Sequence, residues 1–151
     1  MLPIKKIICP TDFSHPSYEG LKTAVELADH FTAELILLHA VSPMPVMAGA
    51  GAPTGFHIPA VLEEMEENAA KMLEDIKSGE IKKSINIRTM VVHGRPADEI
   101  ARLAEEEKAE MIVMATHGQS GWRRLISGSV TERVVRMAPC PVMAVPAPSD
   151  E

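Results

Sequence analysis

The stretch EMIVMATHGQSGWRRLISGSVTERVVR, from Glu110 to Arg136, contains the pattern that indicates the fold most clearly. It opens with an apolar run that ends at Ala115, continues through a loop containing Gly118, and reaches a predicted helix start at Gly128-Ser129. A buried strand, a glycine-containing loop and a helix N-terminus in this order make an anion site, because free backbone N–H groups and the helix dipole face the ligand. The stretch therefore predicts the phosphate end of a nucleotide site.

Apolar segments of strand character alternate with helical patterns along the rest of the chain. Strands are predicted at residues 4–9, 34–41, 85–92, 111–115 and 142–145, and helices at 15–32, 61–77, from 96 onward and at 129–137. Such alternation is typical of a parallel sheet with helices on both faces and right-handed crossovers. We expect an α/β fold in a single domain, residues 1–151.

Asp12 stands directly after the first predicted strand, and ligands of parallel sheets bind at the carboxyl ends of strands where the strand order reverses. Ser14 is a candidate N-cap of the following helix, with Pro16 in its first turn. Two interpretations of Asp12 stay open, because a strand-end aspartate can bind a ligand or only cap a helix.

Two further segments lead to more general expectations. Residues 42–59 are rich in proline and glycine, which predicts a long loop that is either a lid over a site or a plain connector. The helix that follows has one apolar stripe, expected to pack on the sheet: Leu62, Met65, Ala69, Met72 and Ile76. Residues 146–151 form a polar tail.

Charge and composition exclude several classes of partner. The 151 residues carry a formal net charge of −6 without a basic block, which argues against nucleic acid and anionic membranes. The pair Arg123-Arg124 is expected to be a solvated surface group. No apolar run approaches the roughly 20 residues of a membrane span, and no secretory signal is present, so a cytoplasmic location is expected. Cys9 and Cys140 are expected to be buried free thiols.

From Ile4 to Val145 the chain resembles the universal stress protein (UspA-like) family. The resemblance rests on IICPTDFS after the first strand, on VHGRPA from Val92 to Ala97, and on the long segment THGQSGWRRLISGSVTERVVRMAPCPVMAV that begins at Thr116. It implies a flavodoxin-like or Rossmann-like three-layer sandwich with a five-stranded parallel sheet of order 3-2-1-4-5. In that order the first and fourth strands lie side by side, so Asp12 and the end of the fourth strand would flank one crevice.

Members of the family that bind ATP carry the pattern Gly, two residues, Gly, nine residues, then Gly-Ser or Gly-Thr. In this chain Gly118 matches the second glycine, nine residues follow, and Gly128-Ser129 completes the pattern. The first glycine is replaced by Ala115. A methyl group is harmless there if φ is negative and costly if the ligand touches the Cα atom. We expect the site to tolerate it.

The resemblance also implies a role for each candidate site residue. Asp12 would accept a hydrogen bond from the ribose, and the backbone of Val41 would meet the adenine edge. The remaining candidates would line the base and ribose (Pro10, Thr11), form the end of the fourth strand and its turn (Met114, Ala115, His117), or hold the phosphates (Gly118, Gly128, Ser129, Val130, Thr131). Mg²⁺ would be carried mainly by phosphate oxygens.

Purely structural roles remain as alternatives for several of these residues. Ser129 has capping-box spacing with Glu132 and can be an N-cap alone. Gly118 and Gly128 can be turn residues without a ligand. His117 can touch a phosphate, act as a base, or fix its loop by a hydrogen bond, and we favour the last.

The chemistry of familiar nucleotide enzymes is missing from the sequence. There is no G-x-x-x-x-G-K-[ST] loop, no G-x-G-x-x-G fingerprint, no G-x-S-x-G elbow and no zinc-type histidine spacing. We therefore expect a regulatory stress-response protein that binds ATP or a related adenine nucleotide, with slow hydrolysis at most. The alternatives are a dimeric interaction protein without nucleotide binding and a slow ATPase in which His117 or Asp12 orients water.

The fifth predicted strand, Val142 to Val145, is apolar and lacks the charges that protect a free sheet edge. We expect it to pair with the same strand of a second copy in a homodimer, as the resemblance also implies.

Overall fold

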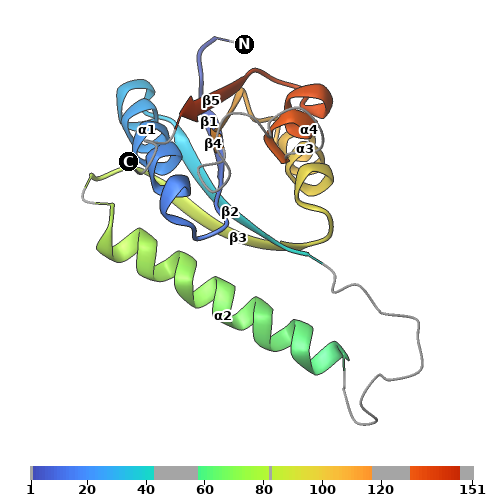
Figure 1. The fold of residues 1–151 in the computed structure, drawn as a ribbon. Coiled ribbons are helices and arrows are strands. Elements are labelled where there is room, and N and C mark those ends of the chain that lie inside the picture. The colour runs from blue at the N-terminus through green and yellow to red at the C-terminus, as the bar shows by residue number, and fades with distance from the viewer. Residues whose placement is uncertain (1, 43–57, 82, 117–129, 147–151) are drawn as a thin grey trace, which may run out of the picture.

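The protein folds into one five-stranded parallel sheet between two layers of helices (Figure 1). The computed structural model describes residues 2–42, 58–81, 83–116 and 130–146. The strands are β1 (Lys6–Pro10), β2 (Glu34–Val41), β3 (Ile87–His93), β4 (Met111–Thr116) and β5 (Val142–Pro146). Their order is β3-β2-β1-β4-β5. This confirms the predicted fold class and strand order.

Four helices connect the strands and cover both faces of the sheet: α1 (His15–Phe31), α2 (Ile58–Gly79), α3 (Pro96–Glu106) and α4 (Val130–Met137). Helices α1 and α2 pack on one face, while α3 and α4 contact each other on the opposite face (Figure 1). The expected loop at 42–59 and the tail at 146–151 lie almost wholly outside the described residues.

Strand β1 forms the centre of the core because its side chains alternate between the two helix layers. Ile7 and Cys9 belong to the cluster under α1 and α2, whereas Ile8 belongs to the cluster under α3 and α4, and all three side chains are fully buried. Val113 and Met114 of β4 divide between the same two clusters. A strand buried on both faces explains why its sequence reads as a continuous apolar run.

Helix α1 begins and ends as its sequence indicates, with one difference. Ser14 is the N-cap residue, but its side chain makes no capping hydrogen bond; it donates instead to Oδ1 of Asp12. At the other end Thr32 adopts a left-handed conformation with φ of 55°. The amide of Ala33 then donates to the carbonyl of Ala28 over 2.9 Å, which satisfies one of the last carbonyls of the helix.

Helix α2 packs with a stripe that differs from the predicted one. The structure buries Ala69, Leu73 and Ile76 against the sheet, whereas Met65 and Met72 remain 39% and 44% exposed. Positions 72 and 73 lie on opposite sides of the line through Ala69 and Ile76, so a small rotation about the helix axis buries Leu73 instead of Met72. Leu73 was missed for this reason, and Met72 was wrongly assigned to the buried face.

The two cysteines differ in environment, so the expectation of two buried thiols is only half correct. Cys9 is completely buried in β1, and this burial raises the pKa of its thiol to about 12. Cys140 lies in the turn between α4 and β5 and is partly buried, which also raises its thiol pKa. Both are free. Within the described ranges, no helix has the length and apolar character that crossing a bilayer requires.

The amino ends of β1, β2 and β3 are joined by a network of charged side chains. The guanidinium of Arg88 donates to both oxygens of Glu107 over 2.9 and 2.6 Å and to Glu34 over 3.1 Å. The ammonium of Lys6 lies 2.9 Å from Glu107. The bidentate bond from Arg88 and the bond from Lys6 lower the pKa of Glu107 to about 2, while the bonds to Glu107 and Glu34 raise the pKa of Arg88.

The Glu107 network predicts a specific acid sensitivity. Because the folded-state pKa lies below the ordinary value, the contribution of Glu107 to stability is complete above about pH 5 and is lost as the pH falls toward 2. Glu107→Gln should therefore flatten the fall in the free energy of unfolding over this range by about 2 kcal/mol. Urea unfolding at several pH values measures it. Glu105→Gln, at an exposed position in the last turn of α3, which Glu107 caps, should keep the parental slope.

Gly20 on α1 allows the helix to approach the end of β4 closely. A Cβ atom at this position would lie 2.8 Å from the backbone nitrogen of Ala115 and 3.2 Å from the carbonyl carbon of Met114. Both neighbours are backbone atoms of a central strand, so they cannot rotate away. A glycine is therefore required here for packing.

We expect Gly20→Ala to destabilise the protein by about 1–2 kcal/mol, because overpacking outweighs the gain in helix propensity. Gly79→Ala is the matched control, since a Cβ atom there meets nothing within 4 Å. That variant should be neutral or slightly more stable. Chemical denaturation of both proteins measures the difference, and equal stabilities would contradict the packing argument.

Candidate functional site

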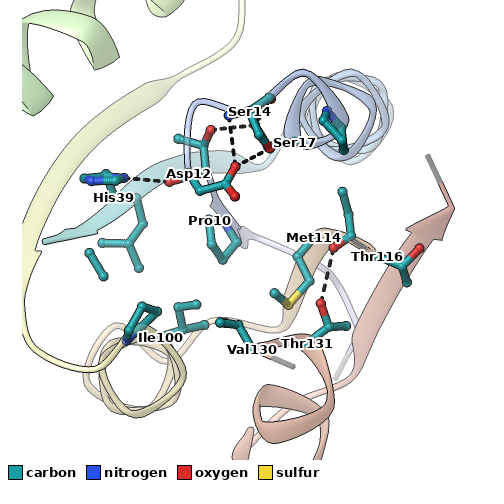
Figure 2. Close-up of a pocket in the computed structure, with 16 residues that line it drawn as sticks. Pro10, Asp12, Ser14, Ser17, His39, Ile100, Met114, Thr116, Val130 and Thr131 are labelled. Atoms are coloured by element: carbon teal, nitrogen blue, oxygen red, sulfur yellow. Dashed lines mark hydrogen bonds between the residues drawn. The ribbon is translucent and has the colours of Figure 1, made fainter. Parts of the chain in front are cut away.

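One pocket lies at the carboxyl ends of β1, β2 and β4, on the side where α3 and α4 begin (Figure 2). Its position is where the strand order reverses, since β1 pairs with both β2 and β4. The structure brings seven of the predicted site residues together in its wall: Pro10, Thr11, Asp12, Met114, Ala115, Val130 and Thr131. Residues far apart in the sequence thus share one cavity.

Asp12 follows β1 and is exposed at the pocket edge. Its Oδ1 atom accepts hydrogen bonds from the amide of Ser14, over 3.0 Å, and from the Ser14 hydroxyl. This arrangement is an Asx-type turn that organises the entry into α1. Asp12 is therefore not the N-cap of α1, which is Ser14, and its binding of a ligand stays a prediction (Figure 2).

The end of β4 and the start of α4 form the opposite wall. Thr131 is buried, and its hydroxyl donates to the carbonyl of Ala115 over 3.2 Å. This bond ties the first turn of α4 to the strand end. Val130 begins the helix, so the N-terminal end of α4 and its positive dipole end lie at the pocket (Figure 2).

The other predicted residues lie elsewhere. Val41 ends β2 with a buried side chain; its carbonyl accepts a hydrogen bond from the amide of Gly94 over 3.0 Å, and it is not part of the pocket wall. The remaining four candidates, His117, Gly118, Gly128 and Ser129, fall outside the described residues.

Several wall residues were not predicted as site residues. Ile100 of α3 and Leu38 of β2 join Met114 to make an apolar side, while Ser17 and His39 add polar groups. His39 had a usable signal, because it stands two residues before the end of the second strand. Ser17 had none, since a serine in the first turn of a helix is common.

The electrostatics of the described wall are set by Asp12 and by backbone dipoles. None of the described lining residues is lysine or arginine. In the described part of the chain, no group of three or more histidine, cysteine, aspartate or glutamate side chains could hold a metal ion. The arrangement suits a ligand with an apolar ring, hydroxyl groups near Asp12, and an anionic end near α4.

Comparison with known families gives one match over nearly the whole chain. Residues 3–146 match the model of the universal stress protein family. Over 147 residues the chain is 37% identical to universal stress protein MJ0531 of Methanocaldococcus jannaschii, covering 97% of this chain and 85% of that protein. It is 31% identical to universal stress protein YxiE of Bacillus subtilis, covering 93% and 97% of the two chains.

Solved structures agree with this match. The fold superposes on that of protein MJ0577 with a TM-score of 0.81 at 28% identity, covering 97% of this chain and 99% of the other. It superposes on UspA from Lactobacillus plantarum with a TM-score of 0.72 at 25% identity, covering 94% and 97%. The sandwich and its strand order are thus shared with proteins of this family.

Proposed function

This chain belongs to the universal stress protein family, and from that premise we propose that it binds an adenine nucleotide, ATP in the first place, as a regulatory stress-response protein. The site is the pocket at the carboxyl ends of β1 and β4. One observation carries the proposal: the pocket places the Asp12 carboxylate on one side, the N-terminus of α4 on the other, and an apolar wall between them.

Each part of the pocket suits one part of a nucleotide. Leu38, Ile100 and Met114 offer apolar surface to the base. Asp12 accepts hydrogen bonds from ribose hydroxyls. The first turn of α4 offers backbone N–H groups to the phosphates, and Thr131 contributes chiefly through its amide because its hydroxyl already donates to Ala115.

The sequence adds the glycine pattern that the structure does not describe. Gly118 and the pair Gly128-Ser129 have the spacing of the ATP-binding members of the family. His117 and the backbone of Val41 remain proposed contacts on the same basis. The replacement of the first glycine by Ala115 is accommodated in this proposal, since Ala115 lies in the pocket wall beside the glycine of α1.

Two solved proteins of this fold carry adenine nucleotides. One is a universal stress protein in complex with cAMP, at 23% identity, and another is the universal stress protein from Archaeoglobus fulgidus in complex with dAMP, at 20% identity. At such identities the likeness concerns the fold alone. It makes an adenine nucleotide a reasonable first ligand to test.

Binding is favoured over catalysis. Phosphoryl transfer requires charge stabilisation and a positioned nucleophile. The described wall contains no lysine or arginine that could stabilise a leaving phosphate. Mg²⁺ would accompany ATP through phosphate oxygens. A slow ATPase that uses His117 or Asp12 to orient water is the weaker candidate.

The proposal predicts measurable nucleotide affinity. Protein denatured directly after purification should release ATP or ADP, and MgATP should bind the emptied protein in a calorimetric titration. Asp12→Ala should weaken binding by about 10- to 100-fold, as expected for loss of a hydrogen bond to a charged group. Asp29→Ala removes an exposed aspartate that pairs with Lys83, and it should leave binding unchanged.

The absence of both released nucleotide and titration heat at millimolar MgATP would reject nucleotide binding. In that case the dimeric interaction protein without a nucleotide becomes the better description. Equal losses in the Asp12→Ala and Asp29→Ala proteins would instead mean that the site has been placed wrongly.

We also propose that β5 mediates a homodimer. It ends the sheet beside β4 and presents Met143, which is 37% exposed, and the exposed Ala144. An unprotected apolar edge strand tends to pair with another strand. A second copy of the same strand would satisfy its outer N–H and C=O groups and cover these side chains.

Light scattering should therefore give a mass twice that of the 16.4 kDa chain. Met143→Lys places a charge on the edge and should shift the protein to the monomer. Met65→Lys, which alters an equally exposed methionine on α2, should remain dimeric. A monomeric parent protein would exclude the β5 dimer.

A further inference from the structure

The residue after Asp12 has an unusual backbone conformation. Phe13 adopts φ of 62°, in the left-handed region that residues other than glycine, asparagine and aspartate rarely occupy. Such a conformation persists only where the surrounding structure enforces it, and it is found often at ligand sites. Phe13 lies between Asp12 and Ser14, whose amide and hydroxyl donate to Oδ1 of Asp12, so the groups that hold Phe13 also support the turn that carries this carboxylate.

Two contacts hold Phe13 directly. Its amide donates to Oγ1 of Thr11 over 3.1 Å, and its ring lies against the imidazole of His39, with 4.4 Å between ring centroids. The same imidazole donates from Nδ1 to the carbonyl of Thr11 over 2.8 Å. The residues on both sides of Asp12 are thus fixed, one through its hydroxyl and carbonyl and the other through its amide and ring.

The Thr11 hydroxyl is in turn oriented by Ser17. The Ser17 hydroxyl donates to the carbonyl of Ser14 over 2.6 Å, which uses its one proton. It can therefore only accept from the Thr11 hydroxyl, 3.0 Å away. Thr11 then has its own lone pairs free to accept from the Phe13 amide. The chain of bonds runs from Phe13 through Thr11 and Ser17 to Ser14, and each hydroxyl donates once and accepts once.

Both hydroxyls are shielded from water, since Thr11 is 7% and Ser17 is 9% exposed. Water cannot easily replace a lost partner at these buried hydroxyls, so this chain of hydrogen bonds has a single arrangement. Figure 2 shows Ser17 and Ser14 beside Asp12 at the pocket edge. Ser17 thus anchors the turn that carries Asp12 on the acidic side of the pocket.

We propose that Ser17 is a positioning residue that fixes the Asp12 carboxylate through Thr11 and so sets the preference for a ribose over a deoxyribose. The inference rests on the proposed nucleotide site and adds its sugar specificity. Because the residues on both sides of Asp12 are fixed, its carboxylate keeps one direction. A sugar hydroxyl placed in that direction can donate a hydrogen bond to it, and this favours binding of the ribose. Without the Ser17 hydroxyl, the Thr11 hydroxyl proton loses its acceptor, and the turn around Asp12 can adopt other conformations.

The test compares nucleotides that differ only in sugar hydroxyls. Dissociation constants of ATP, 2′-deoxyATP and 3′-deoxyATP are measured for the full-length parent and for Ser17→Ala. The parent should prefer ATP over at least one deoxy analogue by on the order of tenfold, the effect of one hydrogen bond to a charged group. Ser17→Ala should lose most of this preference, mainly through weaker binding of ATP.

Ser78→Ala is the matched control. The Ser78 hydroxyl also donates to a backbone carbonyl of the preceding turn, that of Glu74, over 2.9 Å, and it lies on the exposed end of α2. This variant should keep the parental preference. Thr11→Val breaks the same link from the other end and should resemble Ser17→Ala, while Thr11→Ser keeps the hydroxyl and should retain the preference. The Thr11 pair also serves if Ser17→Ala does not fold.

A second readout needs no nucleotide. Amide resonances of Thr11, Asp12 and Phe13 should move in Ser17→Ala and stay in place in Ser78→Ala. An unchanged sugar preference, or an equal loss of affinity for all three nucleotides, would overturn the specificity assignment. If the parent binds no nucleotide, the proposed function fails, and unmoved resonances would separately overturn the positioning role.

Discussion

The burial of Ile7, Ile8 and Cys9 of β1 between two neighbouring strands and two helix layers determines how the other elements are arranged. Because β2 pairs on one side and β4 on the other, the connections that leave the sheet diverge at the carboxyl end of β1. Helix α1 turns to one face, whereas α3 and α4 cover the other. The space between these departures is the pocket. Strand order opens this space, and the segment between β1 and α1 supplies Asp12 to its wall.

Sequence periodicity predicted the elements better than it predicted their contacts. Apolar runs located all five strands, and the strand order followed from the family resemblance. The stripe of α2 was wrong in part, because Met72 and Leu73 flank the line through Ala69 and Ile76 and tertiary packing chooses between them. Ser14 is the N-cap residue as predicted, but its hydroxyl donates to the Asp12 carboxylate and makes no capping bond.

The candidate site could be predicted in part for a similar reason. Residues that end a strand or begin a helix, such as Asp12 and Thr131, announce their position in the sequence. Ser17 does not, and the position of His39 near the end of its strand does not reveal its partners. His39 meets Thr11 across 28 positions, and it stands in an apolar run that reads simply as a buried strand.

Different interactions stabilise the sheet at the amino ends and at the carboxyl ends of its strands. Charges that neutralise one another join the amino ends of the strands, as Arg88 and Glu107 show. The carboxyl ends of β1 and β4 are instead held by bonds of hydroxyls and backbone groups. This same end borders β5, because the Thr116 hydroxyl of the pocket wall donates to the carbonyl of Val145 over 3.3 Å. The proposed nucleotide site and the proposed dimer edge therefore share the β4–β5 strand pair.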